Sequence, residues 1–434
     1  MTHPPFRPSR RDLLAGFGAF ALPVLPASIA AAESSPWTLR AGPGALVLRT
    51  GEPATRVWSL DASPRRLRRG DVTQIAFTND LPVSTALNWR GIDGVSACEP
   101  LLVRPPLAQG KADAFNLPLR QAGTYLCDLS LSADGTAQPA RPLALIVAES
   151  EPPLIDRDEL LLIEGWRLRP DGTAIAPGVD AAGTASGYTV NGVIMPDIRL
   201  LAGERVRFRL INGLHRSVIA LKFEHHDTLI MALDSQPAEP FLARNGAVAL
   251  APAGRADVFL DVKREAGDSS VLLHDGEAAR TVARLIVSEE PSIRKNALPP
   301  PPALPSNNLP ERLDLKTALR VELALGDDRK NWVRPSAFAT DSPPAFNAKL
   351  GRAVVLSLIN RAATTVVVHL HGHHFRLLDR LDDGWKPFWL DTIAIDAGQT
   401  QRIAFAAEYA GQWLIEAAET RWEAPRLLRW YAVK

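Results

Sequence analysis

Residues 203–212 have the sequence GERVRFRLIN, in which Gly203 precedes a strand-like run and Asn212 ends it. The same order of glycine, run and asparagine occurs from Gly70 to Asn79 and from Gly351 to Asn360. Gly and Asn bound short strands because both accept the backbone conformations of turns. The phrase recurs at intervals of roughly 130–150 residues, as in an internal repeat. It predicts three β-domains of one kind.

The rest of the chain fits an all-β protein, because short runs rich in Val, Ile, Leu and Thr alternate with Gly, Pro, Asn and Asp. We expect domains over residues 36–150, 151–292 and 310–434. A stiff proline-rich linker is expected over 293–309, where residues 298–305 have the sequence LPPPPALP. Sustained helical periodicity is scarce, and one short helix is expected over residues 418–428.

The N-terminus has the order of an export signal. Residues 9–14 (SRRDLL) resemble a twin-arginine motif, an apolar run follows over 13–25, and Ala30–Ala32 supply a small-residue cleavage site. The pattern predicts a signal peptide over 1–32 and a periplasmic protein. The alternative is the basic N-terminus of a cytosolic protein. The apolar run is shorter than the roughly 20 residues of a membrane span, and no later segment is expected to cross a membrane.

Charge and cysteine content narrow the function further. The chain has 49 Lys and Arg against 48 Asp and Glu, so nothing favours nucleic acid or an anionic membrane as partner. Two cysteines, Cys98 and Cys127, cannot form a cysteine-rich metal site. Export would permit a disulfide between them, and two buried thiols are the equal alternative.

Residues 366–375 have the sequence VVVHLHGHHF, which resembles the HPxHLHGHxF-type motif of multicopper oxidases. Residues 188–192, 203–212, 230–234 and 250–258 resemble further signatures of that family, in its copper-free middle domain. The resemblance covers nearly the whole chain after residue 32. It implies three cupredoxin-like Greek-key β-sandwich domains.

The positions that match the family's electron-entry copper carry no donor atom. This copper takes two imidazoles, a thiolate and often a methionine. The matching residues here are apolar: Val366, Ala417, Trp422 and Leu427. Bulky Trp422 is expected to fill the space beside small Ala417.

The family's three-copper cluster takes eight imidazoles, of which only His369 and His371 remain. The other matching positions hold Asn88, Arg90, Asp128, Ser130, Glu416 and Ala418. A permanently cationic Arg90 repels cupric ions. We therefore expect Arg90, Asp128 and Glu416 to form an ionic network there.

Three histidines of this segment alternate along an expected strand, and so share one face: His369, His371 and His373. They offer a residual metal site for Zn²⁺ or Cu²⁺. The alternative is that they are packing and hydrogen-bonding residues of an inherited scaffold. No motif for a catalytic nucleophile, a zinc protease, a phosphate or a dinucleotide occurs, so no catalytic or organic-cofactor residue is predicted.

The sequence therefore predicts an exported relative of multicopper oxidases that acts as a non-catalytic scaffold with a protein partner in the cell envelope. In its loss of ligands it is similar to the copper-free cell-division scaffold proteins of that family. The alternatives are a copper-binding oxidoreductase, or a periplasmic metal-binding protein that uses His369 and His371. No resident cofactor is expected beyond copper at low occupancy.

Overall fold

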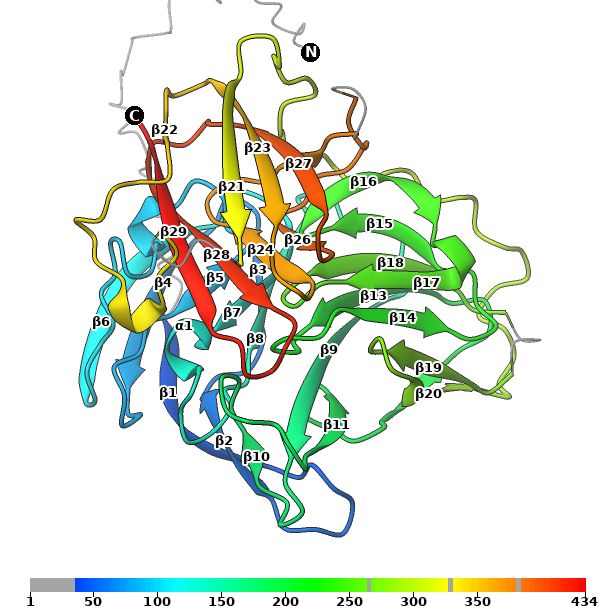
Figure 1. Cartoon of the computed structure of the whole chain (residues 1–434). Helices are drawn as coiled ribbons and strands as arrows, with labels where there is room; N and C mark the ends of the chain where they lie inside the picture. Colours follow the sequence, from blue (N-terminus) through cyan, green and yellow to red (C-terminus); the bar gives the residue numbers. More distant parts are fainter. Residues whose placement is uncertain (1–35, 264–266, 327–330, 380–383) are drawn as a thin grey trace, which may run out of the picture. The chain divides into compact units, whose positions relative to one another are not determined.

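The computed structural model describes residues 36–434 except 264–266, 327–330 and 380–383. The expected signal peptide lies outside the described residues. The regular secondary structure of the described chain is almost entirely β-strand (Figure 1), as the sequence predicts. No helix among the described residues is long and apolar enough to span a membrane.

The first sandwich pairs two four-stranded sheets (blue to cyan in Figure 1). One has the order β2 (Thr55–Leu60), β1 (Trp37–Leu46), β4 (Val72–Asn79), β6 (Lys111–Pro118). The other has the order β3 (Arg65–Arg68), β8 (Leu143–Ala148), β7 (Gly123–Asp128), β5 (Asn88–Arg90). Two short helices lie in its loops: η1 (Ser96–Cys98) and α1 (Ser130–Ala133).

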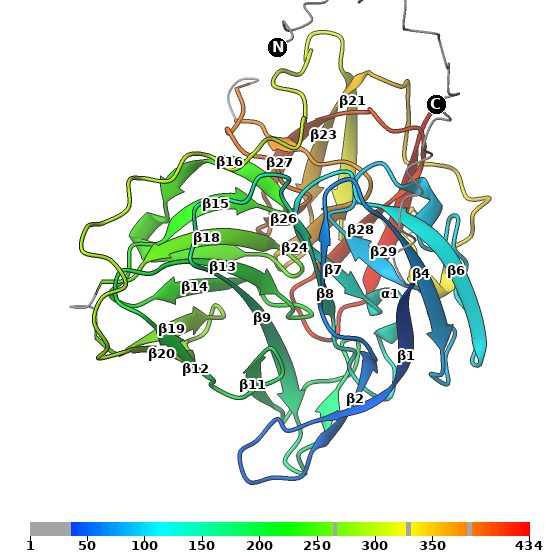
Figure 2. The same cartoon turned by 180° about the vertical axis from the view of Figure 1, so that it is seen from behind.

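The second sandwich, green in both views (Figure 2), has a larger first sheet. Its order is β10 (Ala174–Ile175), β9 (Arg157–Leu168), β13 (Arg205–Asn212), β18 (Arg255–Asp261), β15 (Leu229–Leu233), β16 (Gln236–Leu242), and β11 (Ala185–Val190) also pairs with β9. The second sheet has the order β12 (Asp197–Leu200), β20 (Ala279–Val287), β19 (Ser269–His274), β14 (Ile219–Phe223), β17 (Ala247–Leu250). Helix η2 (Arg244–Gly246) precedes β17.

The third sandwich carries most of the residues that resemble copper motifs. One sheet has the order β21 (Leu319–Leu325), β23 (Ala353–Asn360), β27 (Thr400–Ala406), β25 (Arg376–Leu377). The other has the order β22 (Asn347–Ala348), β29 (Arg426–Val433), β28 (Gly411–Glu419), β24 (Val366–Leu370), β26 (Thr392–Ile395). Helix η4 is Pro335–Ala337.

The repeated phrase of the sequence has one structural role in all three sandwiches. Asn79, Asn212 and Asn360 end β4, β13 and β23 and are buried. Each side-chain amide donates to two backbone carbonyls, and its oxygen accepts the backbone N–H two residues on. Asparagine thereby fixes the turn that leaves each strand, because buried backbone groups require partners.

Each sandwich has its own apolar core, with buried members in residues 37–147, 161–287 and 323–433. In the third sandwich alternate residues of β24 and β28 face that core, including Val366 and Val368 of β24 and Ile415 and Ala417 of β28. Successive side chains of a strand point to opposite faces. The other face of β24 and β28 therefore carries His369 and Glu416, which are also paired across the two strands.

Two local expectations are settled by the structure. The helix expected over residues 418–428 is wrong, because these residues form the end of β28, a turn and the start of β29, and Ala417 pairs with Leu427. Backbone pairing with a neighbouring strand overrides a weak local helix signal. Cys98 and Cys127 are buried free thiols, and burial raises the pKa of both.

Candidate functional site

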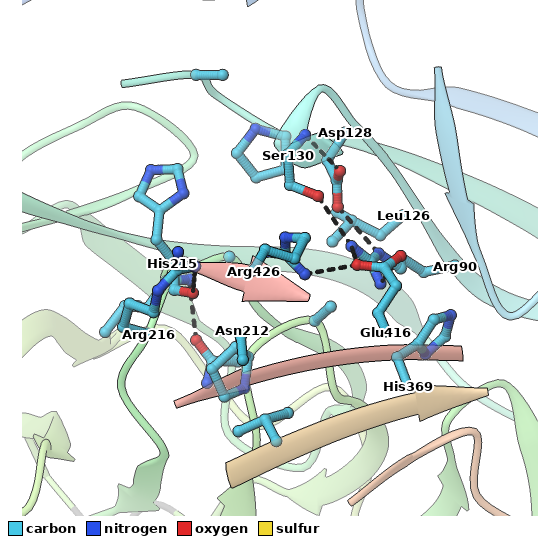
Figure 3. A pocket seen from close by; sticks show the side chains of 18 of the residues that line it. Arg90, Leu126, Asp128, Ser130, Asn212, His215, Arg216, His369, Glu416 and Arg426 are labelled. Carbon is cyan, nitrogen blue, oxygen red and sulfur yellow. Dashed lines mark hydrogen bonds and ion pairs between the residues drawn. The ribbon is translucent and has the colours of Figure 1, made fainter. Parts of the chain in front are cut away.

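The candidate site lies where the polar face of β24 and β28 meets β5 and β7 of the first sandwich. In the first sandwich β5 pairs with β7, so that Asn88 stands opposite Asp128 and Arg90 opposite Leu126. Figure 3 shows the side chains of Arg90, Asp128 and Glu416 directed toward one another. Segments more than 300 residues apart in the chain thus meet in one buried cluster.

Glu416 is the acceptor at the centre of this cluster and is 1% exposed. Its Oε1 accepts from Asn88 Nδ2 at 2.7 Å and from His371 Nε2 at 2.7 Å. Its Oε2 accepts from Arg426 Nη1 at 2.5 Å and from Arg90 Nη2 at 3.1 Å. Burial alone would raise the pKa of Glu416, but Arg90 and Arg426 outweigh burial and hold this pKa well below its usual range.

Arg90 is 2% exposed and connects the two sandwiches. Its Nε donates to Asp128 Oδ2 at 3.0 Å and its Nη2 to Ser130 Oγ at 2.9 Å. Burial lowers the pKa of Arg90, while Asp128 and Glu416 raise it by more, so the guanidinium stays charged. The network expected among Arg90, Asp128 and Glu416 is confirmed, and Arg426, Asn88 and Ser130 extend it.

His371 is a charged member of the same network. Its Nδ1 lies 2.9 Å from Glu99 Oε1 and its Nε2 lies 2.7 Å from Glu416 Oε1. Burial lowers the pKa of His371, but Glu99 and Glu416 together raise it to about 9. Both ring nitrogens therefore carry protons at neutral pH, and an imidazolium has no lone pair for a metal.

His369 is kept neutral beside it. Its Nδ1 lies 2.8 Å from Thr392 Oγ1. That hydroxyl donates to Asp391 Oδ1, so Nδ1 is the protonated nitrogen of His369 and Nε2 is the acceptor. Burial lowers the pKa of His369 to about 4, although Asp391 opposes this shift. One acceptor imidazole nitrogen remains between His369 and His371.

His373 does not join the other two histidines. Its ring packs among Phe405, Tyr409, Trp413 and Tyr431, inside the third sandwich. Its Nδ1 bonds Tyr431 Oη at 2.7 Å, and its Nε2 accepts from the Tyr409 N–H at 3.2 Å. The alternation of His369, His371 and His373 does not produce a shared face, because β24 ends at Leu370 and the chain turns at Gly372.

The electron-entry positions are only partly together. Val366, Ala417 and Leu427 pack in or against the third core. Trp422 does not fill the space beside Ala417, so that expectation is wrong. It lies in the turn between β28 and β29, where its Nε1 donates to Ala176 O at 2.9 Å and its ring meets the edge of His215.

Copper does not fit the residues at either place. At the electron-entry positions the side chains are hydrocarbon, apart from a Trp N–H that donates elsewhere, and none can ligate. At the cluster positions, Arg90 and charged His371 are cations, and the carboxylates of Asp128 and Glu416 already bind cations. Ala418 adds no donor. Among the described residues, no group of three or more His, Cys, Asp or Glu has an arrangement that could hold a metal ion.

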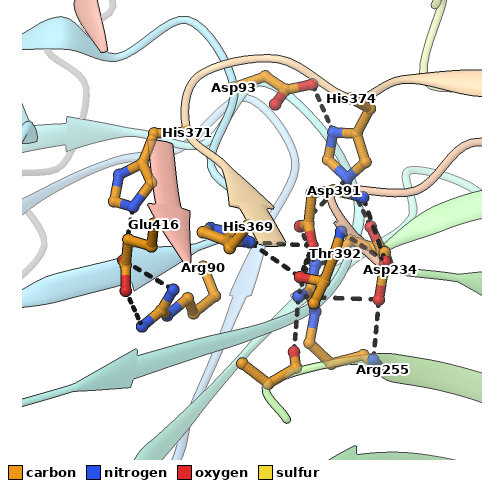
Figure 4. A network of polar contacts seen from close by, with 12 residues as sticks. Arg90, Asp93, Asp234, Arg255, His369, His371, His374, Asp391, Thr392 and Glu416 are labelled. Carbon is orange, nitrogen blue, oxygen red and sulfur yellow. Dashed lines mark hydrogen bonds and ion pairs between the residues drawn. The ribbon is translucent and has the colours of Figure 1, made fainter. Parts of the chain in front are cut away.

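A second buried network lies beside the first and joins all three sandwiches (Figure 4). His374 bonds Asp93 Oδ2 of the first sandwich and the Asp234 carbonyl of the second, both at 2.6 Å. Arg255 of the second sandwich is bidentate to Asp391 of the third. Burial lowers the pKa of His374, but Asp93 raises it to about 9.

Only indirect signals for this second network are present in the sequence. Asp234 and Arg255 stand in stretches that resemble family signatures, and those stretches support the fold alone. The available signal was that the two residues are charged and follow apolar runs. Asp93 and Asp391 have no such signal, because their partners come from other sandwiches.

A cavity opens beside the Arg90 cluster (Figure 3) and is lined by all three sandwiches. Arg90, Asp128 and Ser130 line it from the first, His215 and Arg216 from the second, and these residues from the third: Val367, His369, Glu416, Ala418, Glu419, Arg426. The space open to the centres of water-sized groups is about 50 Å³, which holds a few water molecules.

Comparisons with known proteins agree with the resemblance. The profile of the family described as "Multicopper oxidase" matches residues 312–434. The multicopper oxidase MmcO of Mycobacterium tuberculosis is 22% identical over 403 residues, covering 80% of this chain and 76% of that protein. A laccase of Haloferax volcanii is 26% identical over 286 residues, covering 59% of this chain and 49% of that protein.

Solved structures share the whole described fold. Lac15 from a marine microbial metagenome superposes with a TM-score of 0.77 at 25% identity, covering 92% of this chain and all of that one (100%). A multi-copper oxidase from Pseudomonas thermotolerans superposes with a TM-score of 0.76 at 22% identity, covering 92% and 98% of the two chains. Residues 312–434 thus match the profile of the multicopper oxidase family, and the described chain has the fold of solved multicopper oxidases.

Proposed function

We propose that this chain is an exported, copper-free member of the multicopper oxidase family that acts through a protein partner in the cell envelope and catalyses no oxidation. The observation that carries the proposal is the buried Arg90–Glu416 ion pair, with Nη1 and Oε1 2.8 Å apart. It occupies the place where family motifs put imidazoles and copper. A fixed cation there opposes metal binding through Coulomb repulsion in a poorly hydrated site.

Further support comes from the way the remaining histidines are used. His371 is held as an imidazolium between Glu99 and Glu416. His373 hydrogen-bonds Tyr431 and Tyr409, away from the cluster. Neither is available as a ligand without breaking a buried hydrogen bond, which costs about 1–3 kcal/mol for each group left unpaired.

Export and the envelope partner rest on the sequence. The proposal takes residues 1–32 as a twin-arginine signal peptide and the periplasm as the destination. Scaffold proteins of the same family that have lost copper provide the precedent for a non-catalytic role. Fold alone does not specify function, so the partner must be found by experiment.

The test is the metal content of the protein exported from copper-supplemented cells. It is purified without an affinity tag of histidines, measured by elemental mass spectrometry, and its visible spectrum is recorded. We expect colourless protein with copper and zinc near zero per chain. A matched Arg90→His, Glu416→His double variant, measured in the same way, shows whether removal of the cation and the carboxylate admits metal.

The other outcomes separate the alternatives. About one copper or zinc per chain, lost on His369→Ala, would favour a periplasmic metal-binding protein. About four coppers per chain with a blue absorption band would favour a copper-binding oxidoreductase. Either result would overturn the proposal. If the protein is metal-free, the next experiment is a pull-down of its partners from the cell envelope.

A further inference from the structure

The cavity beside the Arg90 cluster has more donors than acceptors. Glu416 accepts from four side chains, which fills the roughly four lone-pair positions of a carboxylate. Glu419, also on the wall, accepts from Thr364 Oγ1 and Arg421 Nε. Asp134, outside the wall, accepts through its Oδ2 from Arg216 Nη2 at 2.6 Å and from the Arg426 backbone N–H at 3.0 Å. These carboxylates are therefore already paired with donors, and His369 Nε2 is the imidazole acceptor of the wall that remains.

Two donors that belong to the cavity wall lack an acceptor among the described residues: Arg216 Nε and Arg426 Nε. Arg216 is 2% exposed and Arg426 is 9% exposed. A buried N–H without a partner costs about 1–3 kcal/mol, so such groups indicate an absent acceptor. The two come from different sandwiches and line one space, which points to one shared acceptor.

Arg216 and Arg426 also act on each other electrostatically. Burial lowers the pKa of Arg216 and the charge of Arg426 lowers it further, while Asp134 and Glu416 oppose these shifts. The two guanidinium groups thus repel each other, the nearby carboxylates offset part of the repulsion, and a bound anion would offset more of it. In Figure 3 Arg426 stands between Glu416 and the side of the cavity that carries His215 and Arg216.

The shape and lining of the cavity define the anion. Guanidinium groups recognise planar oxyanions with paired N–H donors. The rest of the wall is largely apolar, with Leu126, Val367, Ala253 and Ala418 among its members. The space suits a molecule of a few heavy atoms. A planar oxyanion with a short hydrocarbon tail satisfies both halves of the wall.

We infer that this three-sandwich cavity binds a short-chain aliphatic carboxylate of acetate to propionate size, with Arg216 and Arg426 as its anchors. Half-buried His215 and Glu419 also line the cavity. A bound carboxylate would contact all three sandwiches at once. Its binding would therefore be coupled to the way the sandwiches pack together. This inference rests on the proposed function in one respect, since it requires the cluster to be free of copper.

The test is calorimetric titration of the full exported protein, whose metal content is measured on the same sample. Sodium propionate is titrated at constant ionic strength set with sodium chloride, and propionamide serves as the neutral probe of equal shape. We expect saturable binding of propionate and none of propionamide. Arg426→Lys keeps the charge but loses the Nε–H and the fork, so it should weaken binding about tenfold or more.

Ala418→Leu fills the cavity without a change of charge and should also abolish binding, which keeps the test valid if Arg426→Lys does not fold. Arg68→Gln, at an exposed residue of β3, is the control and should bind as the unaltered protein does. No saturable heat, equal heat with propionamide, or full binding by Ala418→Leu would overturn the inference. Copper in the sample would refute the proposed function instead, whereas copper-free protein without binding refutes only this inference.

Discussion

At the scale of single residues, Glu416 is the shared acceptor that connects the first and third sandwiches. It stands where the family motif has histidine, and four donors from two sandwiches meet on its carboxylate. A buried ion cluster is stable only when every charge has partners, because removal from water is costly. Substitution of any one member of the cluster should therefore lower the stability of the contact between the first and third sandwiches.

Arg90→Ala should destabilise the protein by roughly 3–5 kcal/mol, because it leaves Asp128 and Glu416 buried with fewer cations. Chemical denaturation followed by tryptophan fluorescence measures the free energy of unfolding. Arg68→Ala, at an exposed arginine of β3, is the matched control and should change it by less than about 0.5 kcal/mol. An unchanged melting temperature in Arg90→Ala would contradict the network.

Stability should fall as pH rises from about 6.5 to about 9. His371 and His374 have pKa values raised from 6.5 to about 9 in the folded protein, so the folded state keeps two protons that the unfolded state releases. Their contribution is complete below pH 6.5 and is lost as pH passes 9. The slope is about 1.4 kcal/mol per pH unit for each proton.

Urea denaturation between pH 6 and pH 9.5 measures this slope. His371→Gln should reduce the slope by the contribution of one proton. His225→Gln, at an exposed histidine of the second sandwich, should leave the slope unchanged. The same slope in His371→Gln and in the unaltered protein would show that His371 is not charged in the fold.

The sequence anticipated part of this cluster. Arg90, Asp128 and Glu416 could be predicted because they stand at motif positions and have complementary charges. Arg426 and Glu99 could not, because Arg426 reaches Glu416 only through the pairing of β28 with β29, and Glu99 approaches from a loop of another sandwich. Spacing along the chain carries no information on such contacts.

At the scale of elements, the glycine–strand–asparagine phrase was a sound guide, since β4, β13 and β23 coincide with its three occurrences. It succeeds because the turn chemistry of asparagine is local. The prediction of a helix over residues 418–428 was wrong, because β29 pairs with β28 along eight residue pairs. Strand pairing is a non-local contact that composition does not reveal.

Asn212→Asp should destabilise the second sandwich by about 1–3 kcal/mol, because a carboxylate cannot donate to the Ser217 and Leu250 carbonyls that Asn212 now satisfies. Thermal unfolding is the measurement. The control is Asn308→Asp, at an exposed asparagine with φ of 63°. Equal melting temperatures in both variants would refute the structural role of the strand-end asparagine.

At the scale of the whole molecule, the second buried network joins the three sandwiches near His374. Asp391 binds Arg255 across the boundary between the second and third sandwiches, which His374 also crosses to reach Asp234. His374 reaches Asp93 across the boundary between the first and third sandwiches. The described chain from residue 36 onward forms one compact unit. Buried ion pairs between domains couple the stabilities of those domains. If one domain unfolded, the charged residue in the other domain would lose its partner.

Asp391→Asn should weaken that coupling, because the amide removes the nearer of the two carboxylates beside Arg255 and leaves only Asp234. Differential scanning calorimetry should show one transition for the unaltered protein and an earlier, separate transition in the variant. Asp379→Asn, in a half-exposed ion pair with Lys386, is the control and should keep a single transition. One unshifted transition in Asp391→Asn would contradict the coupling.

The saturated carboxylate of Glu416 also limits which single substitutions the interior can accept. Replacement of Glu416 by histidine would leave Arg90, Arg426 and charged His371 together without their shared acceptor. Replacement of Arg90 would leave Asp128 and Glu416 without their shared cation. Each such change alone should lower stability, and only changes made together as a set can avoid this cost.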